Sequence, residues 1–107
     1  MTKTISILGT KYDFVESNPA DDAKLENSDG YYDQSVRKIV VNKDYEDCKQ
    51  SIGDLSVWKN QIARHEIVHG FLAESGLSKY SDDEILVEWI AIQFPKMLET
   101  FKKVDAI

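Results

Sequence analysis

Residues 64–70 read Arg-His-Glu-Ile-Val-His-Gly and contain the only two histidines of the chain, His65 and His69. On a helix, residues four apart lie one turn above each other on the same face, so both imidazoles and the carboxylate of Glu66 would converge on one spot. This is the H-E-x-x-H spacing, in which two neutral imidazoles hold Zn²⁺ and the Glu takes a proton from a metal-bound water. This arrangement of residues would arise by chance about one time in a thousand, so the motif predicts a zinc site on a helix.

Composition limits the kind of protein. The 107 residues suffice for one domain, 1–107, with a modest core and no separate recognition domain. A net charge of -6 opposes binding to a phosphate backbone, so we expect no nucleic-acid partner. No apolar run approaches the roughly 20 residues that span a bilayer, so we expect no membrane association. The lone Cys48 forms no internal disulfide and the N-terminus lacks a signal-peptide pattern, which predicts a cytoplasmic protein, in the host cytoplasm if phage-encoded.

Strand patterns dominate the first part of the chain. Residues 4–8 and 11–15 are rich in β-branched and aromatic side chains around Gly9-Thr10, which predicts a hairpin with a type II′ turn. The segment 18–26 begins with Asn-Pro, which predicts a short helix. A second hairpin is expected from Tyr31 to Asp33 and from Val36 to Val41, followed by a polar loop over 42–53.

Helix patterns follow. Asp54 is the predicted N-cap of a helix that carries the histidines and ends at Gly76. Ser81 and Glu84 form a predicted capping box for a second helix, which Pro95 should kink or end. The predicted fold is therefore α+β, with a small mixed sheet packed on the H-E-x-x-H helix.

Glu88 is the predicted third metal ligand. It falls on one stripe with Ile85, Trp89 and Ile92, so a carboxylate occupies a face otherwise suited for burial, where it needs a cation. The third ligand cannot be a histidine because the chain has no other. Two alternatives remain open. Glu88 could form an ion pair with Arg64 or Lys59. A different acid could be the ligand, and the weaker candidates are Glu74 and three acids expected to be solvated in a cap turn, Asp82, Asp83 and Glu84.

The order of these motifs resembles the ImmA/IrrE family of small gluzincin-type metallopeptidases, found in bacteria and their phages. The resemblance covers about residues 30–94 and rests on Gly-Tyr-Tyr at 30–32, Ile-Val-Val-Asn at 39–42, the histidine motif and Glu-Trp-Ile-Ala at 88–91. It implies a minimal zincin fold, with His65, His69 and Glu88 as zinc ligands and Glu66 as the catalytic acid–base residue.

A peptidase mechanism follows from such a site. Three protein ligands leave a coordination position for water, and Glu66 would act as general base in attack on a peptide carbonyl. Tyr80 is the predicted oxyanion donor, although it could equally be a loop aromatic that packs on the core. A protein or peptide substrate would lie extended along a sheet edge, at Tyr31 to Asp33 or Val36 to Val41.

Each ligating histidine also needs a hydrogen-bond acceptor for its other nitrogen. Backbone carbonyls and three polar side chains are candidates: Asp33, Asn42 and Asp44. The alternative to an enzyme is a non-catalytic, zinc-stabilised interaction or regulatory protein of phage or bacterial origin.

Overall fold

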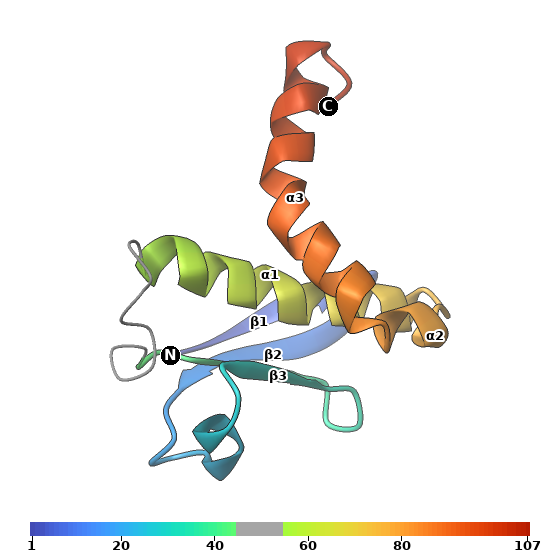
Figure 1. Cartoon of the computed structure of the whole chain (residues 1–107). Helices are drawn as coiled ribbons and strands as arrows, with labels where there is room; N and C mark the ends of the chain where they lie inside the picture. Colours follow the sequence, from blue (N-terminus) through green and yellow to red (C-terminus); the bar gives the residue numbers. More distant parts are fainter. Residues whose placement is uncertain (45–54) are drawn as a thin grey trace.

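The computed structural model describes residues 1–44 and 55–107; the predicted cap Asp54, the lone Cys48 and most of the predicted loop 42–53 lie outside them. Four strands form one sheet in the order β1-β2-β4-β3, the long helix α1 packs on this sheet, and a second long helix, α3, crosses α1 (Figure 1). The elements, in chain order, are β1 (Thr2–Ile7), β2 (Thr10–Ser17), the 3-10 helix η1 (Ala23–Glu26), β3 (Gly30–Asp33), β4 (Lys38–Asn42), α1 (Leu55–Glu74), α2 (Ser78–Ser81) and α3 (Glu84–Lys103).

The sheet is mixed, which confirms the α+β prediction. β1 pairs antiparallel with β2, β3 pairs antiparallel with β4, and β2 and β4 run parallel. No helix in the two described ranges is long and apolar enough to cross a bilayer.

The first hairpin is confirmed, but its turn lies one residue earlier than predicted. Ile7 pairs with Thr10, so the loop residues are Leu8 and Gly9, both at positive φ (51° and 88°), as a type I′ turn requires. This register keeps Thr10 in β2, where its hydroxyl donates a hydrogen bond to Glu74 Oε1 at 2.9 Å. A type II′ turn at Gly9-Thr10 would take Thr10 out of the strand.

The segment after β2 contains less helix than predicted. Asn18 closes a turn instead, because its side-chain oxygen accepts a hydrogen bond from the backbone N–H of Asp21 at 2.9 Å. Helix begins only after Asp22, which caps the single turn η1 by accepting from the backbone N–H of Lys24 at 3.1 Å.

β4 lies inside the sheet, between β2 and β3. It starts at Lys38, later than predicted, and Val36 is exposed in the preceding turn. Its residues 39–42 are all buried, as expected for an interior strand. The prediction that Val36 to Val41 offers a free edge is therefore wrong. β3 pairs with β4 alone among the described strands, so its other edge is the open one.

α1 approaches the sheet closely at Gly70. A Cβ atom at this position would lie 2.7 Å from Ile7 Cδ1, so glycine allows the helix to sit directly on the buried side chains of β1 and β4. The predicted stop is confirmed: Gly76 has φ 77°, and the N–H of Leu77 bonds the carbonyl of Leu72 at 2.9 Å in a Schellman arrangement.

The start of α3 differs from the predicted capping box. Asp83, not Ser81, caps the helix, and its carboxylate accepts from the N–H groups of Ile85 and Leu86, both at 3.1 Å. Ser81 belongs to the preceding turn of helix, α2, where it is buried and its hydroxyl donates to the carbonyl of His69 at 2.9 Å. Because the Ser81 hydroxyl is bonded to a carbonyl of α1, it is not available to cap α3.

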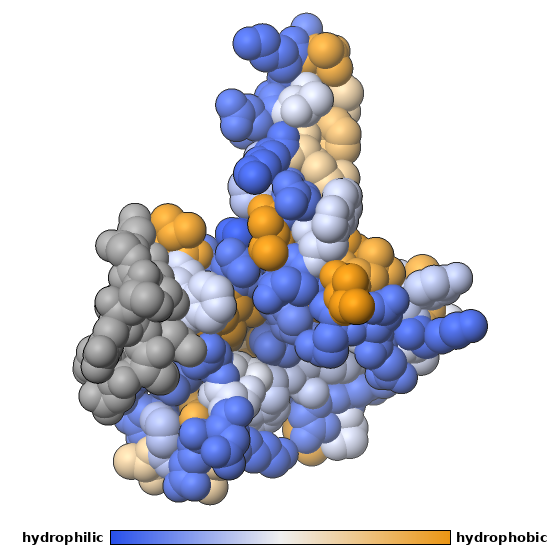
Figure 2. All heavy atoms as spheres, in the orientation of Figure 1, coloured by the Kyte–Doolittle hydropathy of each residue, from blue (hydrophilic) through white to orange (hydrophobic). Residues whose placement is uncertain are grey.

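α3 does not end at Pro95 but continues to Lys103, so of the predicted kink or end of the helix, the end is wrong. A proline has no N–H for the carbonyl four residues earlier, which here belongs to Ala91. That carbonyl accepts a hydrogen bond from Arg64 Nε of α1 at 2.7 Å. The second half of α3 projects from the rest of the molecule with apolar residues along one side (Figures 1 and 2). Only the first half of α3 lies against α1 (Figure 1).

Candidate metal centre

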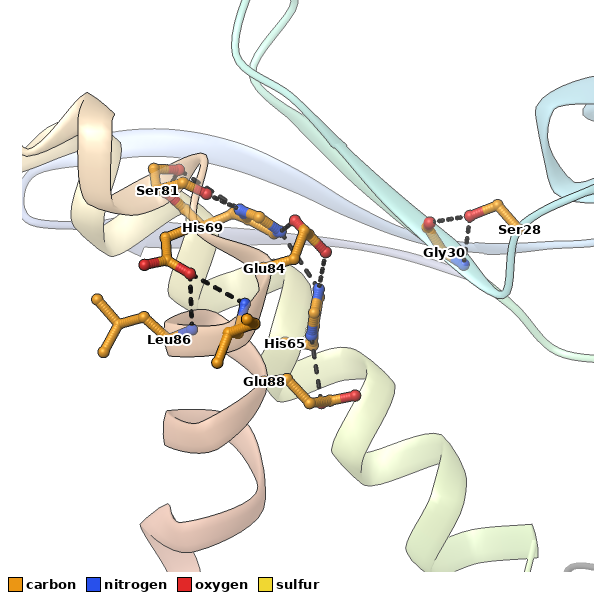
Figure 3. Close-up of polar contacts among 10 residues, drawn as sticks. Ser28, Gly30, His65, His69, Ser81, Glu84, Leu86 and Glu88 are labelled. Atoms are coloured by element: carbon orange, nitrogen blue, oxygen red, sulfur yellow. Dashed lines mark hydrogen bonds and ion pairs between the residues drawn. The ribbon is translucent and has the colours of Figure 1, made fainter.

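Three side chains from two helices converge where α3 begins. His65 and His69, one turn apart on α1, direct their Nε2 atoms toward the carboxylate of Glu84, the first residue of α3 (Figure 3). Glu84 Oε1 lies 2.8 Å from His69 Nε2, and Glu84 Oε2 lies 3.1 Å from His65 Nε2. Within the described ranges, these residues form the one group of acidic, histidine or cysteine side chains close enough to hold a metal ion.

The donor atoms fit a zinc ion. The two Nε2 atoms lie 3.3 Å apart. Two nitrogen atoms about 2.0–2.1 Å from one tetrahedral zinc lie about 3.3–3.4 Å apart, so the observed spacing is compatible with a shared ion.

The other nitrogen of each imidazole meets an acceptor. His69 Nδ1 lies 2.6 Å from the carbonyl oxygen of Ser81. Because a carbonyl can only accept, this contact favours a proton on His69 Nδ1, and the neutral tautomer with its proton there has Nε2 free to ligate a metal. His65 Nδ1 lies 3.3 Å from Glu88 Oε1, which favours the same tautomer. Carbonyl or carboxylate acceptors of this kind orient the histidines of metal sites.

Glu84 and Glu88 thus take different places at the histidines. Glu84 faces both Nε2 atoms, whereas Glu88, one turn later, faces the outer nitrogen of His65. The assignment of Glu88 as a ligand stays a prediction. Its carboxylate does contact His65, but at Nδ1, whereas Glu84 contacts the Nε2 atom of the same imidazole. Glu84 is exposed, as expected for a cap turn, and no sequence pattern predicted that its carboxylate faces the histidines. One usable signal was that Glu84 and Glu88 repeat the one-turn spacing of the histidines.

The alternative partners proposed for Glu88 have other contacts. Arg64 Nε donates to the carbonyl of Ala91, and Lys59 Nζ lies 4.0 Å from Glu16 Oε2. Glu88 instead contacts His65, with 3.3 Å between Glu88 Oε1 and His65 Nδ1.

Among the other acids, Asp82 lines a cavity beside the histidines and Asp83 caps α3, whereas Glu74 lies elsewhere. Glu74, at the end of α1, accepts from Tyr12 at 2.6 Å and from Thr10. The three candidate side-chain acceptors have no contact with the histidines among the described hydrogen bonds: Asp33 accepts from Ser35, Asn42 accepts from the backbone of Asp44, and Asp44 contributes its N–H to that bond. The outer acceptors are instead the carbonyl of Ser81 and Glu88.

Glu66 is buried beside the ligand group, with 8% of its surface exposed. Burial, with smaller contributions from the negative charges of Glu84 and Glu88, raises the pKa of Glu66 to about 7 from an ordinary 4.5, and His65 partly opposes the rise. A carboxyl group with a pKa near neutrality can both accept and return a proton. Gly30 of β3 lies directly over Glu66, since a Cβ atom on Gly30 would lie 3.4 Å from Glu66 Cγ.

Tyr32 holds His69 from the sheet side. Its ring stacks on the imidazole at 6.0 Å between centroids and 9° between planes. The Tyr32 hydroxyl lies 3.2 Å from that of Tyr12, which in turn donates to Glu74. A line of contacts therefore runs from the end of α1 through the sheet and back to His69.

Three cavities lie beside the ligand group. Two of them are lined by Gly30, His65, Glu66 and Glu84: one, of about 230 Å³, extends toward Trp58 and Glu88, and the other, of about 380 Å³, extends toward Tyr31, Tyr32 and His69. The third, of about 520 Å³, is lined by His65 of α1 and by residues of α3, among them Glu84, Glu88 and Trp89. A further cavity of about 740 Å³ lies near η1, and no residue of the histidine motif lines it. Tyr80 is half-exposed on α2 and lines none of the three cavities at the histidines, so its predicted role stays a prediction.

No protein-family model matches the chain, and neither a curated protein nor a solved structure matches it at a significant level. The function of the site must therefore be inferred from its own geometry.

Proposed function

We propose that this protein is a zinc-dependent metallopeptidase of the ImmA/IrrE type, in which His65, His69 and Glu84 hold the ion and Glu66 is the general base. The observation that carries the proposal is the pair of Nε2 atoms 3.3 Å apart with a carboxylate against both, while each Nδ1 meets an acceptor. This arrangement corresponds to an H-E-x-x-H site with an acidic third ligand.

Each residue would have a separate task in hydrolysis. Zinc held by His65, His69 and Glu84 would polarise a peptide carbonyl and activate a water for attack. Glu66, buried beside the ligand group, would accept the proton of the attacking water and return it to the leaving amine. Glu88 and the carbonyl of Ser81 keep the histidines in the ligating tautomer. Tyr80 remains the proposed oxyanion donor.

The substrate would be an extended peptide beside β3. The edge of this strand away from β4 pairs with no other described strand, although the hydroxyl of Ser28 bonds the N–H and the carbonyl of Gly30 at its start. Gly30, Tyr31 and Tyr32 line the same cavity as His65, His69 and Glu66. A peptide paired with this edge would bring one of its carbonyls next to the ligand group. We place this activity in a bacterial or host cytoplasm.

The catalytic test compares wild type with Glu66→Gln, and with Glu99→Gln on the projecting half of α3 as a matched control. Each protein is loaded with Zn²⁺ and incubated with a mixture of unstructured peptides, and cleavage is followed by mass spectrometry. We expect wild type and Glu99→Gln to cleave and Glu66→Gln to retain zinc while losing at least about 100-fold in rate. Equal cleavage by Glu66→Gln would contradict the mechanism. Zinc binding without cleavage by any of the three would favour the zinc-stabilised interaction protein.

The ligand test compares Glu84→Ala with Glu88→Ala by competition for Zn²⁺ with a chromophoric chelator. Loss of a ligand should reduce affinity more than loss of a residue that orients one, which typically costs about 10- to 100-fold. We therefore expect the larger loss from Glu84→Ala. A larger loss from Glu88→Ala would restore Glu88 as the third ligand.

A further inference from the structure

The carbonyl of Ala91 occupies a special position in α3. Pro95 stands four residues later and supplies no N–H, so the helix itself leaves this carbonyl without its usual partner. Ala91 is completely buried, where an unpaired carbonyl is costly. Arg64 Nε provides the missing donor at 2.7 Å, from the neighbouring helix α1.

Both ends of this hydrogen bond belong to the segments that build the ligand group. Arg64 directly precedes His65, the first histidine of the motif. Ala91 lies on the same side of α3 as Glu84 and Glu88, since residues 84, 88 and 91 follow the four- and three-residue helical spacing. The bond therefore joins the backbone of the helix that carries the acids to the helix that carries the histidines.

Apolar packing alone would define the rotation of α3 poorly. The fully buried residues of α3 are Val87 and Ala91, two small side chains, and the helix otherwise leaves the body after crossing α1 (Figure 1). Rotation of a helix by one residue turns each side chain by about 100°, which would direct Glu84 away from the histidines. A hydrogen bond to one particular carbonyl resists such a rotation because it depends on direction.

We propose that Arg64 is a positioning residue for the metal site: it binds the carbonyl that Pro95 leaves free and thereby fixes the rotation of α3, so that Glu84 and Glu88 face His65 and His69. This inference rests on the proposed zinc site but not on peptidase activity.

The experiment is a double-mutant cycle of Arg64→Met and Pro95→Ala with two readouts. The first is the melting temperature of the metal-free protein, and the second is Zn²⁺ affinity measured by chelator competition. Arg64→Met keeps an apolar stem but removes the donor, while Pro95→Ala restores an N–H for the carbonyl of Ala91. Lys96→Met is the matched control, because it removes an exposed cation from α3. Arg64→Lys tests rescue by a residue that can still donate a hydrogen bond.

We expect Arg64→Met to lower both the melting temperature and the Zn²⁺ affinity, the latter by about 10- to 100-fold as for other residues that orient ligands. In the Pro95→Ala background, Arg64→Met should cost less stability because the carbonyl now has a helical partner, but the zinc affinity should stay at least about tenfold lower. Arg64→Lys should recover most of the affinity, and Lys96→Met should bind as wild type does.

Two results would overturn the inference. Either Arg64→Met binds zinc as tightly as wild type, or Pro95→Ala restores affinity together with stability, which would make Arg64 merely a partner for a buried carbonyl. If Arg64→Met alone fails to fold, the comparison of Pro95→Ala with the double variant gives the same decision. Failure of wild type to bind zinc would instead refute the proposed function, and this inference with it.

Discussion

At the scale of single residues, burial of an acid next to other acids has a measurable cost. Glu66 is nearly inaccessible and lies close to Glu84 and Glu88, and its pKa is raised to about 7. A raised pKa means that the folded protein binds this proton more tightly than the unfolded chain does. The stability that the protonated group provides is therefore complete below about pH 4.5 and is lost as the pH rises through about 7.

Glu66→Gln should consequently stabilise the metal-free protein at high pH. The amide is similar in shape and carries no charge, so we expect a gain of roughly 1 to 3 kcal/mol at pH 8 and little difference at pH 5. Urea unfolding in the presence of a chelator at both pH values measures this difference, with Glu99→Gln as the control. A gain that is equal at the two pH values would show that the charge of Glu66 is not its cause.

At the scale of elements, Gly30 brings β3 close to both β4 and α1. A Cβ atom here would lie 2.9 Å from the carbonyl oxygen of Val40 and 3.1 Å from Ile62, in addition to its contact with Glu66. Because the backbone of β4 cannot retreat as a flexible side chain can, Gly30→Ala should displace β3 from β4 and from α1. We expect a destabilisation of about 1 to 3 kcal/mol and weaker peptide cleavage by the zinc-loaded protein. Gly9→Ala, whose Cβ would meet nothing within 4 Å but whose φ is positive, separates backbone strain from crowding in the same unfolding assay.

Elements with a strong periodic pattern could be predicted from the sequence, and those that depend on distant contacts could not. The two hairpins, the helix of the histidines and its end at Gly76 follow from local residue types. The capping box failed because Ser81 finds a stronger partner in the carbonyl of His69, twelve residues away. The carbonyl that Pro95 leaves without a helical donor is bound by Arg64, which lies on another helix. A rule that considers only neighbours in sequence contains neither contact.

The same distinction applies to the site. His65, Glu66 and His69 lie together because one helix carries all three, so their spacing alone places them. Which acid of α3 faces them depends on how α3 is rotated about its own axis. Glu84 and Glu88 are four residues apart, so they lie on nearly the same side of this helix and a small rotation exchanges them. The stripe of Ile85, Trp89 and Ile92 that was expected to be buried is exposed, and the buried residues of α3 are Val87 and Ala91. The hydrophobic pattern therefore predicted the wrong side of α3 as buried and does not distinguish two acids on adjacent turns.

At the scale of the whole molecule, zinc should connect parts that the apolar core connects weakly. The two clusters of the core lie between α1 and the sheet and are centred on Ile7 and Ile39 and on Val41 and Ile62. α3 lies outside these clusters, and in the proposed site Glu84 ties it to the histidines of α1 through the ion. A ligand that binds only the folded state stabilises it, by about 2.7 kcal/mol at a concentration one hundred times its dissociation constant.

We therefore expect Zn²⁺ to raise the melting temperature of the chelator-treated protein by about 10 °C or more, given the size of the chain. His69→Ala should abolish this rise because it removes a ligand, and Glu99→Gln should leave it intact. Differential scanning calorimetry with and without Zn²⁺ measures the shift, and Mg²⁺, which prefers oxygen ligands, should give little effect in the same range. If His69→Ala responded to zinc as wild type does, the stabilising ion would have to bind elsewhere on the protein.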